Sequence, residues 1–145
     1  MQNPVALIFR ALKLRLQGRV RYLDNPESIK LEDSGEEFVA FRKVVVEPAA
    51  IQPTEPGATF RVRFRFKNLS ARANRILSLI PIPLIMAQPG FRSKTWLLGA
   101  HSGDFIGHYE FDTVETANAY WDSLPLRMMR RRAAPNSLKH EISRI

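Results

Sequence analysis

The chain has 145 residues, of which 45% are hydrophobic and 25% are charged, a balance typical of a single globular domain. It contains no cysteine, which excludes disulfides, thiolate catalysis and cysteine-ligated metal sites, and its three histidines lack metal-ligand spacing. The net charge is +8, and residues 58–145 account for it with fourteen Lys/Arg against six Asp/Glu. Such a charge attracts nucleic acid, anionic lipid or an acidic ligand, and it does not choose among them.

We expect an N-terminal extension over residues 1–57. Residues 4–17 predict an amphipathic helix, with basic side chains opposite an apolar stripe of Val5, Ile8, Phe9, Leu12 and Leu16. Either this stripe packs on the protein's own domain or a dimer mate, or residues 1–22 dock on a membrane surface or a partner. Residues 24–35 predict acidic turns, residues 38–46 a strand, and residues 47–57, with three prolines, a connector.

The main domain is expected over residues 58–145, and it opens with the clearest pattern in the chain. Aromatic or aliphatic residues alternate with cations through Phe60, Arg61, Val62, Arg63, Phe64, Arg65, Phe66 and Lys67. A period of two residues predicts a strand with one aromatic face and one cationic face.

Further elements follow in regular order. Ser70 predicts the start of a helix that Pro81 and Pro83 end, and residues 91–98 and 104–111 predict two strands of a hairpin. Asp112 and Glu115 predict a capping box for a helix that Pro125 kinks or restarts. Residues 137–145 predict a last strand. The order β-α-β-β-α-β indicates an α+β fold of the ferredoxin-like type, with an N-terminal helix and an extra strand.

Several segments of this domain resemble the dimeric α/β-barrel superfamily, and within it the YdhR-like monooxygenases related to antibiotic-biosynthesis monooxygenases. The segments are PGFRSKTWLL (89–98), GHYEF (107–111) and ETANAYW (115–121). The resemblance implies a homodimer in which two sheets form a dimeric α/β barrel, with a cavity in each subunit. It also implies that some relatives oxidise aromatic substrates with O₂ and no metal or flavin, while others bind heme.

The two faces of the predicted sheet locate a candidate site. The aromatic face should lie under the helices. The other face then holds Arg61, Arg63 and Arg65 with His108 and Glu110, and continued alternation adds Arg92, Lys94 and Trp96. Because an unpaired buried charge is costly, the arginines either pair with Glu110, Glu141 and a mate's acids or hold a bound anion. For the second case, the catalytic candidates are His108 and Glu110, and the substrate-binding candidates are Arg61, Arg63, Arg65, Arg92, Lys94 and Trp96.

Two functions follow from these observations. The resemblance implies an enzyme of the cofactor-independent monooxygenase type, with no metal and no cofactor, acting on an aromatic or anionic small organic molecule. The alternative is a non-catalytic ligand-binding or interaction protein that docks through residues 1–22. Nucleic acid is not expected as a partner, because RVRFRFKN lacks the glycines of RNA-binding sheet motifs. No stretch is long and apolar enough to span a membrane and no signal peptide precedes the domain, so a cytoplasmic protein is expected.

Overall fold

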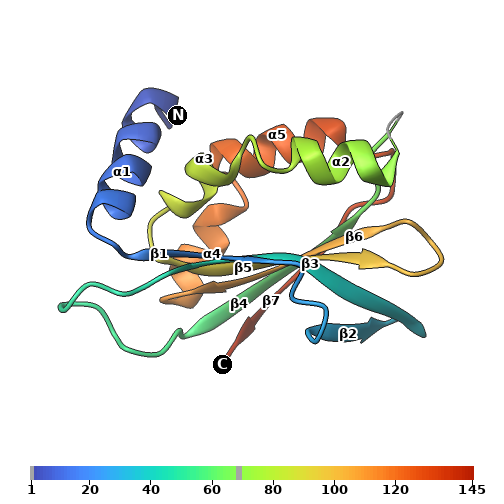
Figure 1. Cartoon of the computed structure of the whole chain (residues 1–145), viewed down its shortest axis with the longest axis horizontal. Helices are drawn as coiled ribbons and strands as arrows, with labels where there is room; N and C mark the ends of the chain where they lie inside the picture. The colour runs from blue at the N-terminus through green and yellow to red at the C-terminus, as the bar shows by residue number, and fades with distance from the viewer. Residues whose placement is uncertain (1, 68–69) are drawn as a thin grey trace.

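A computed structural model describes residues 2–67 and 70–145. One antiparallel sheet forms the base of the molecule, and the helices cover one of its faces (Figure 1). The strands are β1 (Val20–Asp24), β2 (Lys30–Asp33), β3 (Glu36–Val46), β4 (Ala58–Phe64), β5 (Phe91–Gly99), β6 (Phe105–Phe111) and β7 (Lys139–Arg144). The helices are α1 (Pro4–Leu16), α2 (Ala71–Leu77), α3 (Ile82–Met86), α4 (Val114–Tyr120) and α5 (Leu124–Arg132).

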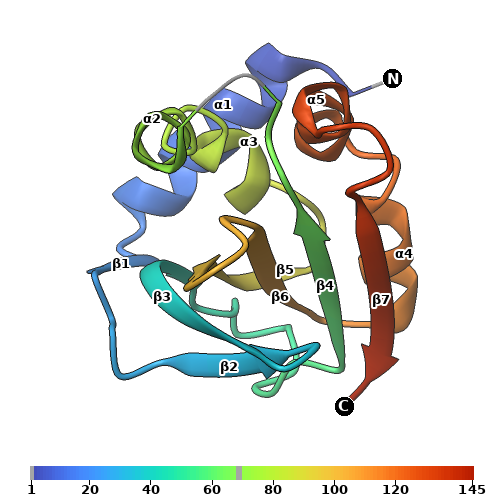
Figure 2. The ribbon, with the colours of Figure 1, turned by 90° about the vertical axis from the view of Figure 1, so that its right-hand side faces the viewer.

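The strand order confirms the predicted fold class. Strands follow one another as β1-β3-β5-β6-β4-β7, and β2 pairs with β3 outside this path. The four strands β5, β6, β4 and β7, with helices after β4 and β6, form the ferredoxin-like β-α-β-β-α-β unit. Strands β1 and β3 extend the same sheet beyond β5, and β2 lies beneath it (Figure 2).

Three local predictions are corrected by the structure. The acidic segment 24–35 contains strand β2, which a turn at Ser34 and Gly35, both with positive φ, joins to β3. The prolines expected to end a helix instead begin α3, since Pro83 occupies its first turn, where backbone N–H groups have no helical partner. The capping box of α4 is formed by Thr113 and Thr116, whose side chains and backbone N–H groups bond reciprocally.

The core lies between the sheet and the helices. Phe60, Val62 and Phe64 are buried on this face of β4, as their alternation with arginines predicted. The Phe60 ring meets the rings of Tyr109 and Tyr120 edge to face, with centroids 5.5 and 5.4 Å away. Aromatic residues of two strands and one helix therefore join the two layers.

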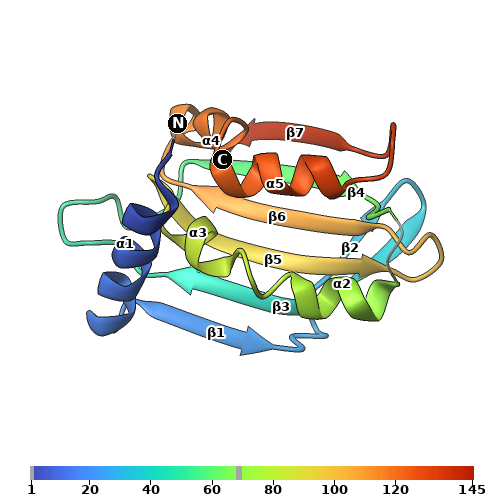
Figure 3. The same ribbon diagram turned by 90° about the horizontal axis from the view of Figure 1, so that it is seen from above.

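Helix α1 does not bury its apolar stripe on the protein's own domain, which was one of the predicted alternatives. Asn3 caps the helix, with its side chain accepting the Val5 N–H at 2.9 Å. Leu7, Ala11 and Leu14 are the buried residues, and α1 packs on α3 (Figure 3). The predicted stripe of Val5, Ile8, Phe9, Leu12 and Leu16 is exposed instead. None of the described helices is long and apolar enough to cross a membrane.

Candidate functional site

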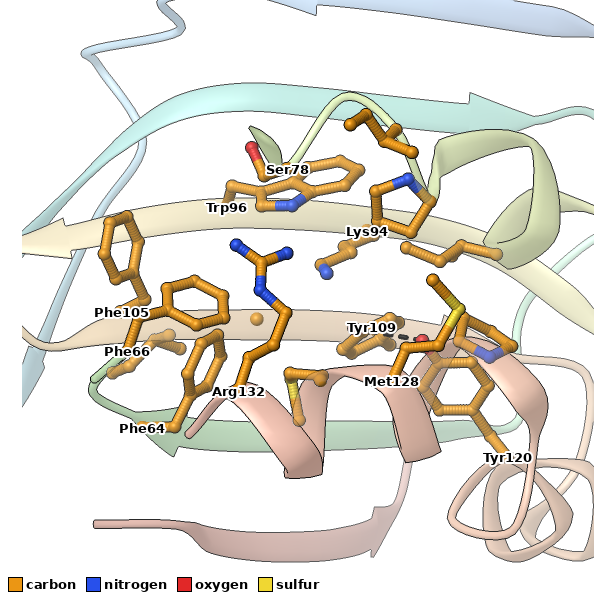
Figure 4. Close-up of a pocket in the computed structure, with 17 residues that line it drawn as sticks. Phe64, Phe66, Ser78, Lys94, Trp96, Phe105, Tyr109, Tyr120, Met128 and Arg132 are labelled. Carbon is orange, nitrogen blue, oxygen red and sulfur yellow. Dashed lines mark hydrogen bonds between the residues drawn. The ribbon is translucent and has the colours of Figure 1, made fainter. Parts of the chain in front are cut away.

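A cavity of about 230 Å³ lies between the sheet and the helices. Side chains of β4, β5 and β6 form its floor, and the α2–α3 turn and helix α5 form its walls (Figure 4). Its lining is largely apolar and aromatic, and includes Phe64, Phe66, Trp96, Phe105, Tyr109, Tyr120 and Met128. An engineered cavity of about 150 Å³ holds benzene, so this space suits a larger aromatic molecule.

Lys94 is a buried cation in the floor of this cavity. Its Nζ lies 4.4 Å from the centroid of the Trp96 ring and 4.7 Å from that of Tyr109. Lys94 forms no ion pair with an acid in the part of the chain that the structure describes. Burial, together with the nearby charge of Arg42, lowers the pKa of Lys94 to about 7. The amine is therefore divided between its neutral and charged forms near neutral pH.

Arg132 brings a second cation to the same cavity from the last turn of α5. Its guanidinium lies 4.7 Å from the centroid of the Phe66 ring. The buried Nη2 has no hydrogen-bond partner among the described residues. Figure 4 shows Arg132 and Lys94 both pointing into the cavity. Two cations without acidic partners, inside an aromatic lining, are suited to an aromatic ligand that bears a negative charge.

Tyr109 and Tyr120 form a hydroxyl pair at the end of the cavity. The Tyr120 hydroxyl donates to that of Tyr109 at 3.1 Å. Burial raises the pKa of both phenols above their ordinary value, so both remain neutral. Gly107 keeps this region open, because a Cβ atom there would lie 2.9 Å from Tyr109 Cε1 and 3.2 Å from Lys94 Cε.

The sequence prediction placed Lys94 and Trp96 on the wrong face of the sheet. Lys94 pairs with Tyr109 and Trp96 with Gly107, which puts both side chains under the helices. A register shift between Phe91 and Ser93 leaves Arg92 in a bulge. Nearly all residues of β5 are buried, on both faces of the strand. The alternation of polar and apolar residues along β5 therefore does not indicate which side chains lie under the helices.

Arg92 joins the sheet to the connector between β3 and β4 and does not enter the cavity. It forms a 2.7 Å ion pair with Asp112 and donates to the carbonyls of Pro53 and Thr54. These contacts hold the connector between β3 and β4 against the sheet.

Arg63 is paired within its own chain, but not with the predicted acids. Its guanidinium contacts Asp33 at 3.1 Å, Glu36 at 3.2 Å and Asp104 at 2.9 Å. Arg65 shares Asp104 at 2.8 Å. Asp33 and Glu36 belong to the β2–β3 hairpin, which lies beneath the sheet, so the cationic face of β4 meets acids supplied by the N-terminal segment.

Glu36 is held as a carboxylate by the same network. It accepts hydrogen bonds from the backbone N–H groups of Ser102 and His101 at 2.7 and 2.8 Å. These bonds and the charge of Arg63 lower the pKa of Glu36 to about 2. The loop GAHSG therefore binds the hairpin that contains Glu36.

His108, Glu110 and Arg61 lie on the face opposite the cavity. Glu110 accepts a hydrogen bond from Ser93 at 2.8 Å. His108 and Arg61 share a small pocket of about 200 Å³ under β2. Burial and the nearby Arg61 lower the pKa of His108, so its ring is neutral. The sheet separates these residues from Lys94, and the predicted site is divided between its two faces.

Sequence reasoning missed the residues that surround Lys94. Arg132 ends a cluster of arginines at the C-terminal end of α5, where cations commonly oppose the helix dipole, and its place in the cavity depends on how α5 crosses the sheet. Tyr109, Tyr120 and Met128 carry no distinguishing pattern, because core packing uses the same residue types. One sequence pattern pointed toward the cavity. The aromatic face of β4 continues onto Tyr109 and Phe105 of β6, and aromatic side chains of this kind can pack around a ligand ring.

No family model matches the chain, and no curated protein matches its sequence. Solved structures do match its fold. A ferredoxin-fold protein related to antibiotic-biosynthesis monooxygenases, from Listeria monocytogenes 4b F2365, has a TM-score of 0.58 and 10% identity over 94% of this chain and 87% of that one. A heme-degrading enzyme from Listeria monocytogenes has a TM-score of 0.55 and 12% identity over 90% and 91%.

A third match is an anthrone oxidase-like protein, with a TM-score of 0.55 and 13% identity over 75% of this chain. The match covers 54% of that protein's length. At these identities the matches establish a shared fold. They confirm the ferredoxin-like fold that the sequence resemblance implied.

The cavity residues do not fit heme. Protein ligands to heme iron are histidine, cysteine, tyrosine or a methionine–histidine pair. The chain has no cysteine, and no histidine is among the described residues that line the cavity. The two tyrosine hydroxyls there are bonded to each other. The space of about 230 Å³ is also below the range of roughly 300–1,000 Å³ usual for larger ligands.

Proposed function

We propose that the chain is a small-molecule enzyme of the cofactor-independent monooxygenase type, acting on an aromatic anion in the cavity above Lys94. The observation that supports this is the buried amine, which has no acidic partner and a pKa of about 7. A group that titrates near neutral pH is suited to proton transfer. The match to structures described as monooxygenase-related and anthrone oxidase-like agrees with this reaction class.

Each cation has its own role in the proposed reaction. Arg132 holds the negative group of the substrate, since a guanidinium binds a carboxylate through two parallel donors and can also donate to a single phenolate oxygen. Lys94, in its neutral form, takes a proton from a ring CH₂ group that the neighbouring aromatic system acidifies. The resulting ammonium then stabilises the conjugate base, in a cavity where water is scarce and charge interactions are strong.

The conjugate base reacts with O₂ directly. Overall, a CH₂ group and O₂ become a carbonyl and water: two C–H bonds break, one C=O bond forms, and the second oxygen atom leaves as water. The substrate loses four electrons and O₂ gains four, so no other reductant is needed. Gly107 leaves room for the ring beside Lys94 and Tyr109.

Anthrone is the probe for this proposal, because it has an acidic CH₂ between aromatic rings and its product, anthraquinone, has a distinct absorbance. Wild-type protein should consume one O₂ for each anthraquinone formed. Lys94→Met should lower kcat by about 100-fold or more, the usual contribution of a general base. Lys139→Met is the matched control, since Lys139 is an exposed lysine on β7.

Arg132→Leu should raise the KM of a phenolic anthrone more than it lowers kcat, because Arg132 is proposed to bind rather than to transfer a proton. Arg131→Leu is its control, since Arg131 is the exposed neighbour on the same helix. Anthrone oxidation by Lys94→Met at the wild-type rate would overturn the proposal. The homodimer expected from the resemblance belongs to the same proposal, and native mass spectrometry of the purified chain tests it.

A further inference from the structure

Helix α1 presents a second apolar face that no other part of the described chain covers. Helix α1 packs on α3, and its buried residues are Leu7, Ala11 and Leu14. On the other face, Phe9 is 67% exposed and Leu16 is 80% exposed. A surface helix usually has one apolar face, toward its own core. The second face of α1 is therefore available to a partner outside the domain.

This face continues onto the neighbouring turn between α2 and α3. A groove of about 340 Å³ joins them, and Ile8, Leu12 and Leu79 are among its lining residues. We call the combined surface the helix-side patch. It consists of the exposed residues Val5, Ile8, Phe9, Leu12, Leu16, Ile76, Leu79 and Ile80. Contiguous exposed apolar surface of this kind marks an interaction site.

The four helices on the side of the helix-side patch carry only positive charges. Helices α1, α2, α3 and α5, which lie on one side of the sheet in Figure 1, contain no Asp or Glu. Their cations are Arg10, Lys13, Arg15, Arg72, Arg75, Arg127, Arg130, Arg131 and Arg132. The acids of the chain lie on the strands, the loops and α4. The molecule therefore has a basic, apolar helix side and a mixed-charge sheet side.

We propose that the helix side docks on an anionic lipid bilayer, with the helix-side patch inserted between the headgroups. Large apolar side chains flanked by Lys and Arg are the composition of helices that lie in a membrane interface. Each Lys or Arg near an anionic surface adds to the attraction. Nucleic acid would leave the exposed Phe9, Leu16 and Ile80 in water, so the observations favour lipid.

Docking in this orientation also places the cavity of Lys94 toward the bilayer. Ile80 belongs to the helix-side patch and lines the cavity, together with Met128 of α5. The next inference rests on the proposed function: the substrate is a lipophilic aromatic anion that reaches the cavity from the membrane. The docking itself does not depend on catalysis.

Sedimentation with sucrose-loaded vesicles tests the docking. The vesicles are pure phosphatidylcholine, or phosphatidylcholine with about one-third phosphatidylglycerol. Wild-type protein should bind the anionic vesicles, and binding should weaken with added salt. Phe9→Gln/Leu16→Gln should lower the partition coefficient by about tenfold, because it removes two inserted apolar groups. Arg127→Gln/Arg131→Gln should lower it by a similar factor at low salt.

Two controls separate docking from other causes. Ile51→Gln changes a 96% exposed apolar residue in the β3–β4 connector, away from the helix side, and should bind as wild type does. Lys94→Met should also bind as wild type does, so failure of the catalytic proposal would not affect this result. Thermal melts confirm that each variant is folded.

Three results would overturn the proposal. The first is equal binding by wild type and Phe9→Gln/Leu16→Gln. The second is no binding to anionic vesicles at low salt. The third is a wild-type oligomer that Phe9→Gln/Leu16→Gln dissociates without any vesicle binding, which would assign the helix-side patch to a second copy of the chain.

Discussion

The ammonium nitrogen of Lys94 lies 4.4 Å from the centroid of the Trp96 ring, two residues further along the same face of β5. The guanidinium of Arg42 lies 5.6 Å from the same ring. Cations are attracted to an aromatic face, but this attraction is worth only about 0.5–2 kcal/mol and does not replace full hydration. The lysine is consequently held where its charge is unfavourable, which is the physical origin of its low pKa.

The lowered pKa of Lys94 predicts a specific dependence of stability on pH. Below pH 7 both folded and unfolded chains bind the lysine proton, and the cost of burying the charge is present in full. Between pH 7 and 10.5 only the unfolded chain keeps this proton, so the free energy of unfolding rises with pH, by at most about 1.4 kcal/mol per pH unit. Above 10.5 the effect is constant.

Urea unfolding of wild type and Lys94→Met between pH 7 and 10.5 isolates the effect. The other titrating groups contribute equally to both proteins, so their contributions cancel in the difference between the two free energies of unfolding. The difference should change with pH between 7 and 10.5. Lys139→Met, which removes an exposed lysine, is the matched control. A difference that stays constant with pH would show that Lys94 has its ordinary pKa.

Arg63→Ala should lower stability rather than ligand binding. The Arg63 side chain is only 18% exposed and contacts three carboxylates, so its removal leaves Asp33 and Glu36 without their cation, while Asp104 keeps Arg65. We expect a loss of about 2–4 kcal/mol in the free energy of unfolding. Arg61→Ala, on the same face of β4, forms no ion pair among the described residues and should cost about 0.5 kcal/mol or less.

Thermal melts and binding of an aromatic carboxylate to the two variants measure these effects. If Arg63→Ala keeps wild-type stability but no longer binds the carboxylate, the cationic face of β4 is a ligand-binding site. The ion pairs of Arg63 with Asp33, Glu36 and Asp104 would then not be its main role.

Gly107→Ala should disturb the cavity from its floor. The new Cβ would lie 2.9 Å from Tyr109 Cε1, so the buried ring or Lys94 has to move. We expect a loss of about 1–3 kcal/mol in stability and about tenfold weaker binding of anthrone, followed by quenching of tryptophan fluorescence.

Gly103→Ala is the matched control, because Gly103 has φ of 74° and open space around it. It should lose some stability through backbone strain and keep its affinity for anthrone. Wild-type affinity in Gly107→Ala would show that the ligand does not occupy the space beside Tyr109 and Lys94.

Much of the fold could be predicted because local patterns are strong there. The alternation at Phe60–Phe66 identified β4 and its buried face, and Asn3 and Ser70 identified two helix starts through capping. The segment 20–33 was harder. Its two short strands have few buried residues and many charges, so their pairing with β3 leaves little trace in hydrophobic periodicity.

The site was predicted only in part, for two physical reasons. A strand that is buried on both faces, such as β5, shows no difference in hydrophobicity between its two faces. The bulge at Arg92 also shifts the register of β5 against β6. The amphipathic stripe of α1 was identified correctly as apolar, yet the buried residues of the helix are Leu7, Ala11 and Leu14. Periodicity shows which residues share a face of a helix, and it does not show what that face meets.

The sequence by itself determined the ferredoxin-like order of strands and helices, the aromatic face of β4 and the excess of positive charge, because these depend on local spacing and composition. The tertiary structure alone decided that Arg63 meets Asp33, Glu36 and Asp104, and that Lys94 and Arg132 enter one cavity. Those contacts join segments distant along the chain. They are set by register, by the crossing of α5 over the sheet and by the fold of β2 beneath it, none of which a local pattern encodes.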